Sequence, residues 1–184
     1  MLTSLGTVVA VPARAHTPYR QWEVYRRKHL LIGCHKDDPD GYALAKEAIA
    51  ALDEHLPAAR ARVARGPTAG RLASLLATEQ MDVALLGEED AIAMTEGSGR
   101  FAPYGAIALA VLVVLPGRLL VARTDLPEQH AWLVADALED WAGGIPGTAP
   151  TEPALPWHPG AERHRRGSPE PPAGSLPAER RTDR

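Results

Sequence analysis

Residues 29–34 read His-Leu-Leu-Ile-Gly-Cys, and they open the stretch 29–94 that decides the fold. A short strand, a loop and a helical pattern follow one another there twice. The first set has its apolar strand at 29–34, its polar loop at 35–41 and its helix at 42–56. The second set has its strand at 60–65, its loop at 66–70 and its helix at 71–79, and a further strand follows at 82–86. Short strands that alternate with helices predict βαβ units, and so an α/β fold with a mainly parallel sheet flanked by helices. Ligands of such sheets bind beyond the carboxyl ends of the strands. We therefore expect the loops 35–41 and 66–70 to face any small-molecule ligand.

Capping residues mark where the first two helices begin. Either Asp38 or Asp40 can cap the helix that follows the first loop, and Thr68 is suited to cap the next one. The first helix carries an apolar stripe at helical spacing, formed by Leu44, Ala45, Ala48, Ile49 and Leu52. These signals predict amphipathic helices that pack on the sheet.

The second half of the chain predicts a hairpin and one more long helix. An acidic helix start follows Gly87, residues 97–105 have the turn chemistry of a loop, and 106–115 is a buried strand. Pro116 and Gly117 form a tight turn, so 118–123 returns as the next strand. A helix from 125 to about 141 then ends at Gly143 and Gly144.

Length and composition limit the possible classes of protein. The 184 residues carry a net charge of -3, which argues against a nucleic-acid-binding surface over the whole chain. The longest apolar run, 106–115, is shorter than the roughly 18 residues that a membrane span needs. The single cysteine, Cys34, excludes an internal disulfide.

The chain divides into four parts. Residues 1–15 have an apolar core and an Ala-x-Ala site typical of a secretory signal peptide, although the basic start is missing and an ordinary N-terminus is the alternative. Residues 16–142 form the α/β lobe. The proline-rich segment 143–164 is expected to be an extended crossing segment that returns to the lobe and buries Trp157. Residues 165–184 are expected to be disordered, because they hold few large apolar residues.

Four segments, in this order along the chain, resemble the TAXI family, the extracytoplasmic solute receptors of TRAP-type transporters. They are Leu-Ile-Gly at 31–33 with Gly41 and Tyr42 after the loop, and the segments 75–86, 119–128 and 156–163. The resemblance spans residues 30–163 and implies a periplasmic-binding-protein-like fold. It also implies export to the periplasm, a small-molecule solute as ligand, and a membrane transporter as partner.

One departure from this family concerns its second lobe. TAXI receptors close two lobes around the ligand, whereas here the strand ending at Leu115 is followed almost directly by 118–123. A single lobe cannot by itself bury the roughly 70–90% of a ligand's surface that pockets usually cover. Either a partner supplies the second wall, or the protein has become an accessory subunit of a periplasmic enzyme or transporter.

The predicted ligand-binding residues lie in the loops after the first three strands: His35, Lys36, Asp37, Asp38, Thr68, Ala69, Gly70, Gly87 and Glu88. Lys36 and the backbone N–H groups at a helix start suit a carboxylate or phosphate, and we expect a small organic or inorganic anion. Asp37 and Asp38 suit a cation instead. A solvated loop and simple helix capping are the alternatives for the first two loops.

No residue pattern predicts an enzyme, a cofactor or a metal site. Cys34 and His35 are neighbours on a strand, so their side chains point to opposite faces, and Cys34 is expected to be a buried structural residue. The seven histidines lack metal-ligand spacing, and no phosphate-binding loop or nucleophile elbow occurs.

Overall fold

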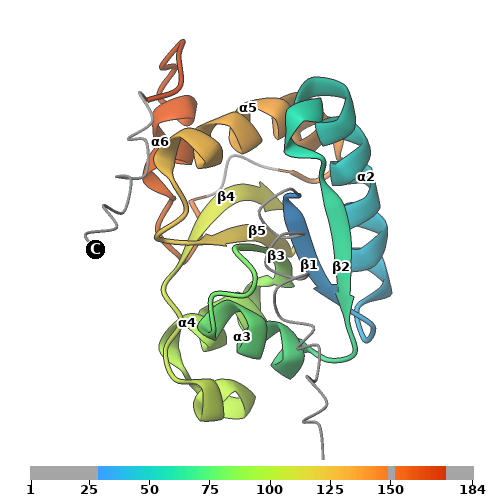
Figure 1. Ribbon diagram of the computed structural model, residues 1–184, viewed down its shortest axis with the longest axis vertical. Helices are drawn as coiled ribbons and strands as arrows, with labels where there is room; N and C mark the ends of the chain where they lie inside the picture. Colours follow the sequence, from blue (N-terminus) through green and yellow to red (C-terminus); the bar gives the residue numbers. More distant parts are fainter. Residues whose placement is uncertain (1–28, 149–151, 173–184) are drawn as a thin grey trace, which may run out of the picture.

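A computed structural model describes residues 29–148 and 152–172 of the chain. Its centre is a five-stranded mixed sheet in the order β2-β1-β3-β5-β4 (Figure 1). The strands are β1 Leu31–His35, β2 Arg62–Gly66, β3 Val83–Gly87, β4 Leu109–Leu115 and β5 Arg118–Arg123. β1 pairs in parallel with β2 and β3, whereas β5 is antiparallel to both β3 and β4. The sheet is therefore mixed rather than mainly parallel, because the Pro116–Gly117 turn returns the chain beside β3.

Helices cover both faces of the sheet. They are α2 Pro39–His55, α3 Ala69–Ala77, α4 Glu88–Glu96, α5 Glu128–Gly144 and α6 Pro159–Arg165, with the short 3₁₀ helices η1 Pro57–Ala59 and η2 Gly99–Tyr104. The apolar side chains of α2 and α5 share one core cluster with one face of the sheet, and those of α3 and α4 share a second cluster with the other face. The α/β class is thus confirmed.

The two clusters divide the strands by side-chain alternation. On β5, Leu120 and Ala122 belong to the first cluster, while Leu119 and Val121 belong to the second. Successive side chains of a strand point to opposite faces, so a strand covered on both sides must be apolar throughout. This explains why the central strands read as continuous apolar runs.

The loop predicted at 97–105 contains a short helix. Residues 99–104 form η2 rather than an irregular loop, because Phe101 is fully buried in the second cluster. The predicted end of the long helix at Gly143 and Gly144 is confirmed, since Gly144 is the last residue of α5 and Ile145 is its C-cap.

The C-terminal segment returns to the lobe but is helical at its end. Trp157 forms a parallel bridge with Val111 of the edge strand β4, and α6 then packs on α5. Trp157 is half-buried, whereas His158 is fully buried. Gly160 is needed at this junction, since a Cβ there would lie 2.0 Å from the carbonyl oxygen of Glu128.

The predictions for residues 1–15 and for most of the tail lie outside the described residues. The proposed signal peptide falls entirely in the part of the chain that is not described, as do residues 173–184 of the predicted tail. Within the described ranges, no helix is both long enough and apolar enough to cross a membrane.

Candidate functional site

The three predicted loops meet at one edge of the sheet, which we call the carboxyl edge. β1 ends at His35 opposite Gly66 of β2, and the Lys36 N–H donates to the Gly66 carbonyl oxygen at 3.1 Å. β3 ends at Gly87, which lies opposite Arg118 at the start of β5. Each of the three strands leads into a helix, α2, α3 or α4. The structure therefore brings the predicted residues to neighbouring positions along one edge.

Asp38 in the first loop is engaged in holding the fold. Its carboxylate accepts a hydrogen bond from the Gly41 N–H at 2.9 Å and so caps α2, which decides between the two capping residues, Asp38 and Asp40, that the sequence allowed. It also forms an ion pair with Arg118, and the Asp38 and Arg118 side chains are only 14% and 18% exposed. A carboxylate with two such partners at a buried position is poorly available to a ligand.

Lys36 and Asp37, which follow β1 directly, are exposed. His35, in contrast, is only 7% exposed, and its Nδ1 atom has no hydrogen-bond partner among the described residues. Strand alternation places His35 on the same face of β1 as Gly33, which lies against Met81 and Leu72. A solute at this edge can therefore reach Lys36 and Asp37 more easily than His35.

Cys34 lies in the opposite core cluster and is 1% exposed. Burial raises the pKa of its thiol, so the side chain remains protonated and unreactive near neutral pH. The prediction of a buried structural cysteine is confirmed.

The second loop supplies the cap of the next helix. The Thr68 side-chain oxygen accepts from the Arg71 N–H at 3.2 Å, which confirms the predicted cap of α3. Ala69 is buried and Gly70 is half-buried. A Cβ on Gly70 would lie 2.9 Å from the Tyr104 hydroxyl oxygen, so η2 places Tyr104 directly beside this loop.

The third loop begins α4 without a side-chain cap. Gly87 occupies the N-cap position, and the Glu88 N–H donates to the Gly117 carbonyl oxygen at 3.4 Å. Glu88 and Glu89 are exposed, while Asp90 binds the Arg100 guanidinium at 2.5 Å. Acidic residues in the first turn of a helix are stabilised by its dipole, and this accounts for all three carboxylates.

Sequence reasoning missed Arg118 and Tyr104. Both reach the carboxyl edge through contacts with residues distant in sequence: Arg118 lies 80 positions from Asp38. The only local signal for Arg118 is its place directly after the Pro116–Gly117 turn. No local pattern marks Tyr104, because the position of η2 depends on the burial of Phe101.

Two cavities lie elsewhere, and neither is lined by a predicted ligand-binding residue. One, of about 520 Å³, is at the opposite edge of the sheet near the start of β1. Among the described residues, no group of three or more His, Cys, Asp or Glu side chains is placed to hold a metal ion.

No protein-family model matches the chain, and no curated protein matches it either. The resemblance to TAXI receptors therefore rests on the four quoted segments alone. Membership of that family, and the periplasmic-binding-protein-like nature of the lobe, are parts of the proposal below.

Proposed function

We propose that this chain is a one-lobed solute-binding module related to the TAXI receptors, which binds a small anionic solute at its carboxyl edge. The observation that carries the proposal is the convergence of three loops, each leading into the N-terminus of a helix of nine or more residues. Helix N-termini present backbone N–H groups and partial positive charge, both of which favour an anion.

The position of the β4–β5 turn supports the one-lobed interpretation. Arg118 lies opposite Gly87, so Pro116 and Gly117 are at the same edge as the three loops. A second lobe inserted at this turn would stand over the loops and supply the missing wall. In this chain a partner protein or a membrane transporter would have to supply that wall, and export to the periplasm is part of the same proposal.

The side chains at this edge favour a polar solute over an apolar docking surface. Lys36, Thr68 and Glu88 are exposed, and Lys36 contributes a positive charge beside the start of α2. The charge of Asp38 is offset by Arg118. Among the described residues, Tyr104 is the one large hydrophobic side chain that is exposed, at 37%. This small amount of exposed apolar surface favours solute binding over the accessory-subunit alternative.

Thermal unfolding with a panel of organic acids, amino acids and inorganic phosphate tests this proposal. A solute at a hundredfold excess over its Kd should stabilise the fold by about 2.7 kcal/mol. Lys36→Gln should weaken that stabilisation, whereas the matched control Lys46→Gln, on an exposed lysine further along α2, should leave it unchanged. If no anion stabilises the protein but a purified partner binds it, the accessory-subunit function replaces the proposal.

A further inference from the structure

The imidazole of His35 is a buried polar group at the carboxyl edge. Its side chain is only 7% exposed, and its Nδ1 atom makes no hydrogen bond with any described residue. A buried polar atom without a partner costs stability, because it has lost its hydrogen bonds to water. Native proteins satisfy most such atoms, so an unsatisfied one needs an explanation such as a bound ion or ligand.

Strand pairing fixes the direction of the His35 side chain. His35 of β1 lies opposite Gly66 of β2, so both residues face the same side of the sheet. A Cβ on Gly66 would lie 3.2 Å from the Leu72 side chain and 3.5 Å from the Thr68 carbonyl oxygen, both at the start of α3. The His35 imidazole therefore extends toward the N-terminus of α3, and Gly66 beside it contributes no side chain that would separate the two.

The first turn of α3 offers further hydrogen-bond donors at this place. The Thr68 side chain satisfies the Arg71 N–H at 3.2 Å. The N–H groups of Ala69 and Gly70, in contrast, make no hydrogen bond with any described residue. The first N–H groups of a helix have no partner within the helix and carry partial positive charge. In the tautomer with hydrogen on Nδ1, His35 adds a third donor to these two.

The charges around the start of α3 favour an anion. Lys36 and Arg71 are both exposed, the first directly after His35 and the second in the first turn of α3. The Lys36 N–H donates to the Gly66 carbonyl oxygen at 3.1 Å, which holds Lys36 beside the second loop. Asp37, the adjacent exposed acid, offsets only one of these two positive charges.

We infer that the start of α3 binds a phosphate group, whose oxygens accept from the N–H groups of Ala69 and Gly70 and from Nδ1–H of His35. A tetrahedral oxyanion has an oxygen for each of the three donors, whereas a carboxylate has only two oxygens. The phosphate group belongs to a free ion or to a monoester. This inference rests on the proposed function and narrows it, because it names the class of anion and makes His35 the residue that selects this class.

Calorimetric titration of the full-length chain with inorganic phosphate, ethyl phosphate and acetate tests the class of anion. At least one of the two phosphates should bind about tenfold more tightly than acetate, and the tighter one distinguishes a free ion from a monoester. Acetate that binds as tightly as both phosphates would overturn the inference. If carboxylates bind in a Lys36-dependent way and neither phosphate binds, the proposed function stands and this inference fails. If no anion binds, both fail.

Substitutions of His35 separate binding from folding. His35→Leu removes an unpartnered polar group from a buried position, so the Tm of the free protein should stay equal or rise. Phosphate should nevertheless bind this variant at least about tenfold more weakly, because a hydrogen bond to a charged group is lost. His35→Asn places an amide nitrogen close to the position of Nδ1 and should keep the phosphate affinity within about threefold. The control His55→Leu, at the exposed end of α2, should leave phosphate binding unchanged.

The ring nitrogen of His35 can also be observed directly, whether or not the leucine variant folds. In nitrogen NMR spectra of the unmodified protein, phosphate should shift the Nδ1 resonance of His35 more than the resonances of the other histidines. The spectrum of His35→Asn assigns the His35 signals by their absence. A His35 resonance that does not respond to saturating phosphate, or an unaltered phosphate affinity in folded His35→Leu, would refute the role of His35.

Discussion

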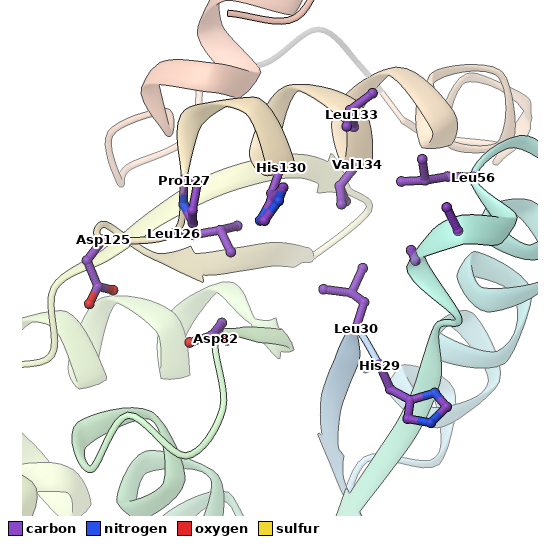
Figure 2. A pocket seen from close by; sticks show the side chains of 12 residues that line it. His29, Leu30, Leu56, Asp82, Asp125, Leu126, Pro127, His130, Leu133 and Val134 are labelled. Carbon is purple, nitrogen blue, oxygen red and sulfur yellow. The ribbon is translucent and has the colours of Figure 1, made fainter. Parts of the chain in front are cut away.

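The two edges of this sheet use their polar residues in different ways. At the carboxyl edge, Asp38 and Thr68 cap helices, and Arg118 binds Asp38, so the polar groups mainly fix where α2 and α3 begin. At the opposite edge, which holds the residues just before β1 and β3 and which we call the amino edge, a cavity of about 520 Å³ lies between η1 and α5, and Asp82 and Asp125 are among the residues that line it (Figure 2). Capping engages polar groups at the carboxyl edge, whereas the cavity at the amino edge has mainly aliphatic walls in the part of the chain that the structure describes. The same sheet therefore has a polar surface at one edge and a partly open, mainly aliphatic cavity at the other.

The largest expected effect is at the junction that holds the amino-edge wall. Gly160→Ala would bring a Cβ to 2.0 Å from the Glu128 carbonyl oxygen and 2.9 Å from the Trp132 nitrogen. Because both are backbone atoms, α6 must move, and we expect the free energy of unfolding to fall by about 3 kcal/mol in urea titrations.

A matched glycine provides the control for this substitution. A Cβ on Gly143, inside α5, meets no atom within 4 Å, so Gly143→Ala should be neutral or stabilising by up to about 1 kcal/mol. Hydrogen exchange should also accelerate more in the first turns of α5 than in α2 for Gly160→Ala. Equal unfolding free energies of the two variants would show that α6 does not hold α5.

The second effect concerns the carboxyl edge. Arg118→Met removes the partner of Asp38 where both side chains are largely buried. We expect the free energy of unfolding to fall by about 2 kcal/mol, a value between those for exposed and for fully buried ion pairs. A double-mutant cycle with Asp38→Asn, which retains an oxygen to cap Gly41, should reveal a coupling energy. Strictly additive effects would mean that the ion pair contributes nothing.

These contacts show which parts of the structure the sequence could predict. Asp38, Thr68 and the apolar stripes act within a few residues of their own helices, so the five strands and the helices α2 to α5 were predicted to within about three residues, whereas η2 and α6 were not predicted. Arg118 and Tyr104 reach the carboxyl edge through long-range pairing, which no local pattern encodes. The amino-edge cavity depends on the distance between η1 and α5, and periodicity carries no information about that distance.

Acidic pH should lower the free energy of unfolding through the buried His158. Burial lowers the pKa of this histidine below its ordinary value of 6.5, and its Nδ1 accepts from the Gly160 N–H at 3.3 Å only when unprotonated. The unfolded chain therefore binds more protons below about pH 6.5. The stability contributed by His158 is complete above that pH and is lost as the pH falls toward the folded-state pKa, with a slope of at most about 1.4 kcal/mol per pH unit.

His158→Asn isolates this contribution, because asparagine keeps a capping oxygen but does not titrate in this range. Urea unfolding between neutral and mildly acidic pH should show a shallower pH dependence for the variant than for the unmodified chain. Parallel curves would show that His158 does not contribute to the acid sensitivity.

The smallest effect separates capping from binding at the carboxyl edge. Thr68→Ala removes the oxygen that accepts from the Arg71 N–H, and should cost about 1 kcal/mol of stability while leaving anion affinity nearly unchanged. Thr68→Asp keeps a capping oxygen and favours the helix dipole, so its stability should match that of the unmodified chain. Its added negative charge should nevertheless weaken anion binding severalfold, and more at low salt than at high salt. Thermal unfolding with and without the best anion from the panel measures both quantities in one experiment. If Thr68→Asp leaves anion affinity intact, the solute does not approach the start of α3, and the carboxyl-edge site must be confined to the other two loops.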